Sequence, residues 1–219
     1  MQISATRSES QVLATNKVLK NTYMLLAMTL LFSAVTAGIA MAMNLPPINP
    51  ILTMVGYFGL LFLTSKFSNQ SLGLLFVFML TGFMGVTLGP IINMYMSIGN
   101  GYQMVMTALG GTGVIFLGLS GYALTSRKDF SFMGGFLMVG ILVAFLAGIG
   151  AMIFSMPILS LAVSGMFILL MSGMILYQTS EIIHGGETNY IMATVSLYIS
   201  IYNLFLSLLH ILSALSGRD

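Results

Sequence analysis

Residues 130–180 read FSFMGGFLMVGILVAFLAGIGAMIFSMPILSLAVSGMFILLMSGMILYQTS, a run of 51 residues without a charged side chain between Asp129 and Glu181. A helix that crosses a bilayer needs about 20 consecutive apolar residues, so the run is long enough for two crossings. Pro157 stands near its middle, and proline favours the first turn of a new helix. The run therefore predicts two membrane-spanning helices joined by a short turn.

Three further uncharged runs complete the pattern. They contain 45 residues between Lys20 and Lys66, 60 between Lys66 and Arg127, and 30 between Glu187 and Arg218. The first two are interrupted by the turn-forming stretches NLPPINP and SIGNG, and the last has room for one crossing. The sequence therefore predicts seven membrane helices, at about 22–43, 50–65, 71–95, 102–125, 130–154, 157–179 and 189–212.

The composition supports a membrane protein and excludes several other classes. Hydrophobic side chains make up 58% of the 219 residues and charged side chains 5%, whereas a soluble domain carries about 25% charge. The net charge of +2 is too small for a nucleic-acid-binding surface. The absence of cysteine excludes disulfides and thiolate chemistry. We expect an all-α integral membrane protein whose main solvent is the lipid bilayer.

The basic residues predict the orientation in the membrane. Six of the seven precede the first predicted helix or lie in the loops after the second and fourth helices: Arg7, Lys17, Lys20, Lys66, Arg127 and Lys128. Loops rich in Lys and Arg stay in the cytoplasm. The pattern therefore predicts a cytoplasmic N-terminus and, after seven crossings, an extracytoplasmic C-terminus.

The first twenty residues, MQISATRSESQVLATNKVLK, differ from the rest of the chain because they are polar and contain no aromatic side chain. Segments of this composition are commonly mobile at a terminus. We therefore divide the chain into a polar cytoplasmic tail at 1–20 and a seven-helix transmembrane domain at 21–219. The tail is either a bare terminus or a handle for a cytoplasmic partner.

Capping residues and small residues give local predictions. Asn49, Asp129 and Thr188 are expected to cap the second, fifth and seventh helices, because side-chain oxygens accept bonds from the first free amides. Small residues four apart let membrane helices approach closely. Such pairs are Gly85 with Gly89, Ser33 with Ala37, and Ala144 with Gly148.

The last predicted helix carries a polar stripe. Ser196, Ser200, Asn203, Ser207 and His210 recur at spacings of 4, 3, 4 and 3, which places them on one helix face. Polar groups avoid lipid, so the stripe is expected to face other helices or a wet cavity. Polar residues of the sixth helix are available as partners: Ser164, Ser172, Gln178 and Thr179. The stripe together with Gln178 is the candidate site, either as interhelical hydrogen bonds or as the lining of a conducting or sensing cavity.

Enzymatic and metal-binding alternatives are weaker. Residues 118–121 read GLSG, like the GxSG motif of intramembrane serine proteases, and His210 is a conceivable base. The predicted topology places Ser120 near the inner end of its helix and His210 near the outer end of another, beyond hydrogen-bond reach. His184 and Glu187 provide too few ligands for a cation. We therefore expect no catalytic residues, no cofactor and no metal.

Five stretches of the chain resemble the Bax inhibitor-1 family across residues 16–212. They are KVLKNTYMLLAMTLLFSAVTA, LTMVGYFGLLFLTSK, TGFMGVTLGPIINMYM, TSRKDFSFMGG and IIHGGETNYIMATVSLYISIYNLFLSLL. The resemblance implies seven helices with the seventh surrounded by the other six, in a bacterial inner membrane. It also implies an interaction with FtsH, a membrane-anchored ATP-dependent zinc protease, and with that protease's membrane regulators. In that picture the chain modulates degradation of other membrane proteins and is itself a slow substrate, held by its N-terminal tail.

Other members of that family are pH-sensitive calcium leak channels that use two aspartates. At the matching positions this sequence has Gln178, within Tyr177-Gln178-Thr179, and Ser200, three residues before Asn203. Neither aspartate is present. The resemblance therefore favours a modulator of the protease, and a calcium or cation leak channel is the alternative.

Overall fold

The computed structural model describes residues 2–217, with side chains from Leu13 onward. This part of the chain is helical, contains no strand, and confirms the predicted count of seven membrane-type helices. Their bounds are α1 Gln2–Ala42, α2 Pro50–Lys66, α3 Ser71–Met96, α4 Gly101–Ser126, α5 Gly134–Ile153, α6 Pro157–His184 and α7 Tyr190–Ser216, with a short 3₁₀ helix, η1, at Ser131–Met133. Six are long and apolar enough to cross a bilayer, and α2 is a shorter apolar helix of 17 residues.

The start of α1 is the largest difference from the predicted boundaries. The helix begins at Gln2 rather than near residue 22, so the polar segment expected to be mobile is a helical extension of the membrane helix. The reason lies in the sequence: no glycine or proline occurs before Gly38. A helix already formed in the membrane adds residues at low cost because its nucleus exists.

One of the three predicted capping residues caps its helix in the structure, and the other two do not. The Asn49 side chain accepts a bond from Ile51 N at 2.9 Å, which confirms it as the cap of α2. Asp129 Oδ1 accepts from Ser131 N at 2.8 Å, at the start of η1, so it does not cap α5, whose cap position is Met133. The cap of α7 is Asn189, whose Oδ1 accepts from the amides of Ile191 and Met192 at 2.9 and 3.2 Å. The prediction of Thr188 as cap is therefore wrong by one residue.

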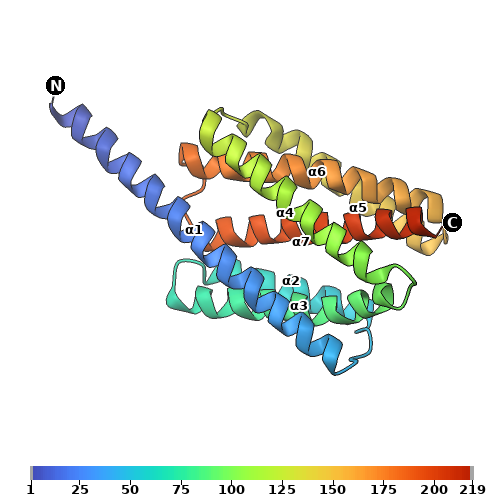
Figure 1. Cartoon of the computed structure of the whole chain (residues 1–219). Helices are drawn as coiled ribbons and strands as arrows, with labels where there is room; N and C mark the ends of the chain where they lie inside the picture. The colour runs from blue at the N-terminus through green and yellow to red at the C-terminus, as the bar shows by residue number, and fades with distance from the viewer. Residues whose placement is uncertain (1, 218–219) are drawn as a thin grey trace. The chain divides into compact units, whose positions relative to one another are not determined.

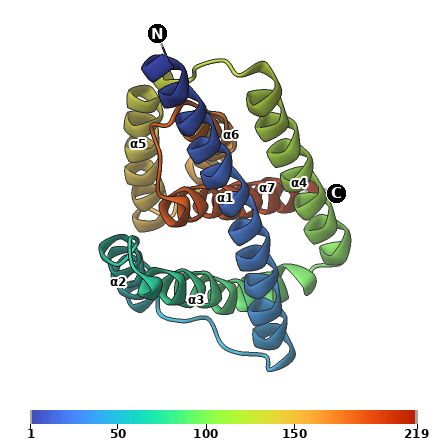
Figure 2. The ribbon, with the colours of Figure 1, turned by 90° about the vertical axis from the view of Figure 1, so that its left-hand side faces the viewer.

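The helices form two compact units. The first comprises the chain up to Met94 together with Ile182–Tyr198, and the second comprises Tyr95–Glu181 together with the chain from Ile199. Figures 1 and 2 show α2 beside α3 in the first unit and α5 beside α6 in the second. Because α7 supplies buried residues to both units, among them Leu197 and Leu204, each unit depends on this polar-striped helix.

Small residues hold α1 against α3 in the first unit. A Cβ added at Gly85 would collide with the Ser33 carbonyl and the Thr36 hydroxyl, and one at Gly89 would lie 2.6 Å from Ala40 Cβ. Ser33 and Ala37 are buried on the facing helix. The small residues at Gly85, Gly89, Ser33 and Ala37 therefore serve as predicted, because helices in lipid associate through close packing.

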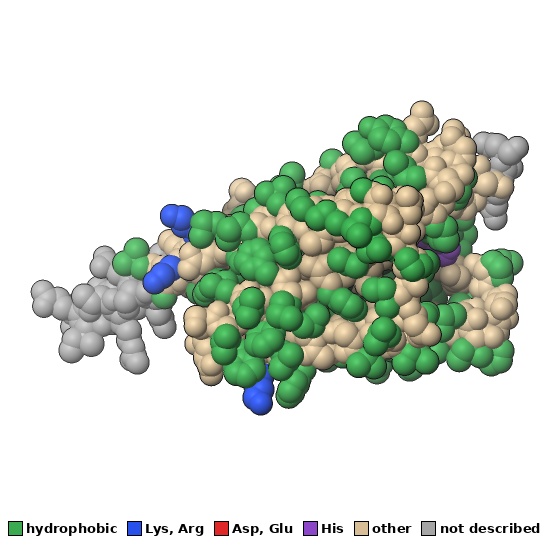
Figure 3. Space-filling model, turned by 90° about the horizontal axis from the view of Figure 1, so that it is seen from below, with side chains coloured by type: hydrophobic (Ala, Val, Ile, Leu, Met, Phe, Trp, Pro, Cys, Tyr) green, Lys and Arg blue, Asp and Glu red, His purple; other side chains and the backbone are tan. Residues whose placement is uncertain are grey.

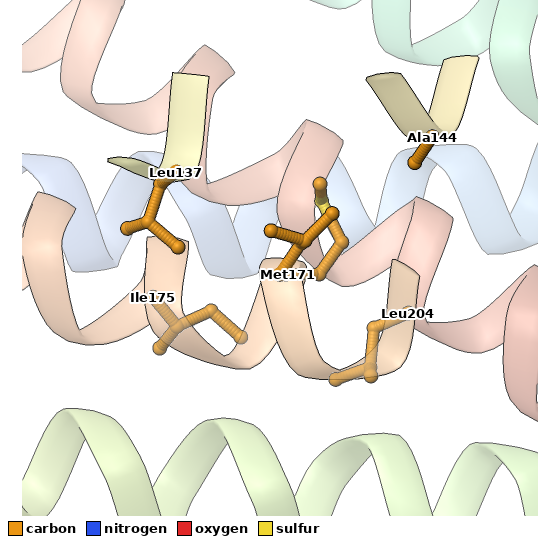
Figure 4. Close-up of a cluster of buried hydrophobic side chains, with 6 residues drawn as sticks. Leu137, Ala144, Met171, Ile175 and Leu204 are labelled. Atoms are coloured by element: carbon orange, nitrogen blue, oxygen red, sulfur yellow. The ribbon is translucent and has the colours of Figure 1, made fainter. Parts of the chain in front are cut away.

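Large apolar side chains fill the second unit instead. Figure 4 shows Leu137 and Ala144 of α5 near Met171 and Ile175 of α6, within a cluster that also includes Leu204 of α7. Ala144 is fully buried, and a Cβ at Gly148 would lie 3.6 Å from Val163, so the third small-residue pair also packs inward. This cluster anchors the part of α7 that carries the candidate site.

The outside of the molecule is apolar. Figure 3 shows hydrophobic side chains spread in patches over one face, between backbone and other side chains, with Lys or Arg side chains toward one end. Large side chains such as Phe132, Phe136 and Ile158 are more than 70% exposed. So many exposed large apolar side chains would be unsuitable in water, so they form the lipid-facing surface of a multi-pass membrane protein.

Candidate functional site

The centre of the candidate site is a hydrogen bond between Gln178 of α6 and Ser200 of α7. Ser200 Oγ donates to Gln178 Oε1 at 3.1 Å, and the two residues are 2% and 9% exposed. Both residues belong to the second unit. The structure therefore brings together the two positions where the calcium-conducting relatives were expected to carry aspartates, and it joins them through neutral groups.

A second contact joins the same two helices farther along. His210 Nδ1 lies 2.8 Å from Ser164 Oγ, and Ser164 Oγ lies 3.2 Å from the Ser160 carbonyl. When the Ser164 hydroxyl donates to that carbonyl, it accepts from an Nδ1–H of His210. The Ser164 hydroxyl, on a residue only 9% exposed, then has a partner both as donor and as acceptor.

The remaining members of the predicted site lie in different surroundings. Asn203 Nδ2 donates to the Ile199 carbonyl of its own helix at 2.8 Å, and Ser207 is buried. Ser196 lies in the part of α7 that belongs to the first unit. Of the six predicted residues, the structure joins Gln178 to Ser200 and joins His210 to a serine outside the predicted set.

The other polar residues of α6 have different partners from the ones expected. Ser172 Oγ donates to the Ile168 carbonyl within α6 at 2.7 Å. Thr179 Oγ1 lies 3.3 Å from Ser120 Oγ of α4. Ser120, the serine of the GLSG stretch, and His210 therefore have separate hydrogen-bond partners, in agreement with the interpretation that the motif is not a serine–histidine pair.

His210 and Ser164 are nevertheless a serine and an imidazole within hydrogen-bond distance. Nucleophilic catalysis also needs a group that orients the base and donors that stabilise an oxyanion. The hydroxyl of Ser164 lies within reach of its own helix at Ser160, and the pair is flanked by apolar residues along α6. What the structure shows for the Ser164–His210 pair is a hydrogen bond that joins α6 to α7.

The electrostatics of the Gln178–Ser200 contact are those of neutral hydrogen bonding. Gln178 and Ser200 do not ionise in the physiological range, so they offer no formal negative charge to a dehydrated cation. Among the residues with described side chains, no cluster of three or more histidine, aspartate or glutamate residues could hold a metal ion. The Gln178–Ser200 contact donates and accepts a hydrogen bond between α6 and α7.

One buried tyrosine of α7 forms interhelical hydrogen bonds that the sequence analysis did not predict. Tyr198 is 1% exposed, its hydroxyl lies 2.6 Å from Ser33 Oγ of α1, and it donates to the Thr81 carbonyl of α3 at 3.4 Å. All three residues lie in the first unit. Tyr198 is outside the predicted stripe, but a tyrosine within an apolar helix is itself a signal, because its hydroxyl needs a partner.

The turn before α7 holds a second group of unexpected contacts. Asn189 Nδ2 donates to Asn69 Oδ1 in the α2–α3 loop at 2.9 Å, while Glu187 accepts from Asn189 N at 2.7 Å. In the second unit, Ser180 Oγ accepts from Phe130 N and donates to the Lys128 carbonyl. In each unit, a residue near the end of a helix therefore holds a loop through side-chain hydrogen bonds.

Comparison with known proteins agrees with this architecture. Residues 15–217 match the model of a family described as inhibitor of apoptosis-promoting Bax1. The chain is 51% identical over 217 residues to "Modulator of FtsH protease YccA" of Escherichia coli K12, covering 99% of this chain and 98% of the relative.

Two further relatives are similar over most of their length. An uncharacterized protein of Pseudomonas aeruginosa is 52% identical over 202 residues, covering 92% of this chain and 91% of the relative. An uncharacterized membrane protein of Vibrio cholerae is 46% identical over 215 residues, covering 98% and 96%. A closely similar relative from another E. coli strain is named an inner membrane protein, which agrees with the apolar helices. This chain is therefore a multi-pass inner-membrane protein that belongs to the Bax inhibitor-1 family.

Proposed function

We propose that this chain is a regulatory protein that binds the membrane-anchored protease FtsH and modulates its degradation of other membrane proteins. The observation that carries the proposal is the 51% identity, over almost the full length of both chains, to a relative named as a modulator of that protease. The apolar outer surface is compatible with lateral helix contacts inside the bilayer. The zinc of the proposed complex belongs to the protease.

The N-terminal segment is the proposed grip for the protease. It is polar, and its described side chains are solvent-accessible: Leu13 is 70% exposed, and Lys17 and Lys20 are exposed. Chain ends with few packing contacts open most easily and are preferred sites of proteolytic attack. The chain is then both a modulator and a slow substrate.

This grip requires the N-terminus to be cytoplasmic. The six basic residues near the predicted inner ends support that orientation. Because the chain has no cysteine, single cysteines at Gly186 and Gly217 report the topology directly. Gly186 is preferable to Gly185, whose φ of 78° strains any other residue. In intact cells an impermeant thiol reagent should label Gly217→Cys and spare Gly186→Cys; the reverse labelling would contradict the orientation.

The neutral Gln178–Ser200 contact favours a regulator over the alternative calcium leak channel. Two nearby carboxyl groups share protons and titrate as a coupled pair, whereas an amide and a hydroxyl do not. We expect the protein in liposomes to leak little calcium, without a steep change between pH 6 and pH 8. Gln178→Asp with Ser200→Asp should introduce pH dependence, and Gln178→Glu alone is the matched control. A wild-type flux as large and pH-dependent as that of the double variant would favour the channel.

Co-purification tests the proposed partner. A C-terminal affinity tag leaves the N-terminus free, and a catalytically inactive protease prevents loss of the bound chain. We expect native membranes to yield FtsH with the tagged protein, together with its membrane regulators when these are bound to it. Recovery equal to that from an unrelated tagged seven-helix protein would contradict the proposal.

A further inference from the structure

The N-terminal segment and the first membrane helix are one uninterrupted helix. α1 runs from Gln2 to Ala42 over 41 residues. At 1.5 Å per residue this is about 60 Å, roughly twice the hydrocarbon thickness of a bilayer. Figure 1 shows the N-terminal part of α1 extending beyond α2 and α3, the other full helices of its unit.

The packing of α1 changes abruptly near residue 22. The Thr22 carbonyl accepts from Thr194 Oγ1 at 3.2 Å, and Leu25 and Leu26 are each 2% exposed. Before this point, Ala14, Asn16, Lys17 and Lys20 are exposed, and none of the described side chains is buried. The extension is therefore held in helical form mainly by its own backbone and by the packed helix that follows it.

Such a helix opens from its unpacked end. An isolated helix of fewer than about 15 residues is marginal in water because nucleation is costly. Here the packed part of α1, from Thr22 onward, provides the nucleus. Each residue of the extension is therefore helical or open according to its own helix propensity. Opening of this kind is local and requires no change in the membrane domain.

We propose that the helix–coil equilibrium of residues 2–20 sets the rate at which the protease engages this chain, a regulation that rests on the proposed function above. When opening and closing are fast relative to cleavage, proteolysis follows the equilibrium population of the open form. The helical extension lowers that population relative to an unstructured tail of the same length. It thereby makes the chain a slow substrate while its membrane domain remains available to occupy the protease.

Two sets of substitutions at positions that are not buried test the proposal without changing length or charge. Ala14→Gly with Asn16→Gly lowers helix propensity, and Thr15→Ala with Asn16→Ala raises it. Thr107→Gly, at an exposed position of α4, controls for general weakening of a helix. Deletion of residues 2–20 tests the grip itself.

The readouts are the half-life in cells with active or inactive FtsH and the amide hydrogen exchange of residues 13–20 in the purified full-length protein. We expect the glycine variant to be degraded roughly five- to tenfold faster than the alanine variant in an FtsH-dependent manner, with faster exchange at these amides. Thr107→Gly should retain the wild-type half-life, and the deletion should be long-lived.

Three results would overturn the inference, and they are distinguishable. One result is equal half-lives of the glycine and alanine variants, together with altered exchange and a long-lived deletion. It would mean that the protease engages the N-terminal segment but that helicity does not set the rate. Unchanged exchange in both variants would show that the extension does not respond as a helix. Normal turnover of a correctly inserted deletion would reject the grip, and the inference would fall with it.

Discussion

The α1–α3 contact and the α5–α6 contact each place a glycine where two helices approach closely. The two contacts differ in which group of the facing helix fills the space beside that glycine. In the first, the space beside Gly85 is occupied by backbone, the Ser33 carbonyl. In the second, the space beside Gly140 is occupied by the end of a side chain, Leu170 Cδ2 at 2.6 Å from an added Cβ. A side-chain end can move to another rotamer and a packed backbone cannot, so equal substitutions at the two glycines should have unequal costs.

The largest effect is expected from Gly85→Ala. The new Cβ must push α1 away from α3, and overpacking of this kind costs about 3 kcal/mol. Reversible unfolding in detergent micelles, followed by helical circular dichroism, measures the loss. Gly110→Ala in α4 is the control, because an added Cβ there meets nothing within 4 Å. Equal stability of the two variants would show that α1 and α3 are not closely packed.

A smaller effect is expected from Tyr198→Phe, which keeps the ring and removes the hydroxyl that meets Ser33 and Thr81. Hydrogen bonds between membrane helices contribute about 0.6 kcal/mol on average and rarely more than about 1.7. We expect a loss of about 1 kcal/mol. A double-mutant cycle with Ser33→Ala isolates the interaction, and a coupling energy near zero would mean that the 2.6 Å contact contributes nothing to stability.

The smallest effect is expected from Gly140→Ala. Leu170 has to shift only its terminal methyl group, so the cost should be below about 1 kcal/mol. Leu170→Ala combined with Gly140→Ala is the informative control, because the added methyl group then has free space. A cost for Gly140→Ala equal to that of Gly85→Ala would remove the distinction between the two contacts.

Much of this architecture could be predicted from the spacing of charged residues. The uncharged runs gave the number of helices because a crossing requires a fixed apolar length, and Asn49 with Pro50 marked the start of α2. The start of α1 could not be predicted in this way. Hydropathy marks where a helix leaves the membrane, and a polar segment that continues as a helix gives no hydropathy signal.

Some hydrogen-bond partners around the candidate site could be predicted. Periodicity placed Ser200 and His210 on one face, and the hairpin direction suggested Gln178 and Ser164 as partners. It did not predict that Thr179 pairs with Ser120 instead, because the rotation of α6 is set by packing against α4 and α5. The cap at Asn189 was missed because adjacent Thr188 has nearly the same capping preference.

We propose that this chain binds FtsH through its membrane domain, slows the degradation of other membrane substrates, and is itself degraded slowly. The most direct measurement is the degradation rate of a second membrane substrate by purified FtsH in liposomes, titrated with this protein. We expect the rate to fall with increasing amounts of the wild-type chain and to fall further with the variant lacking residues 2–20, which binds without being consumed. A degradation rate that does not change at any ratio of this chain to the protease would contradict the account.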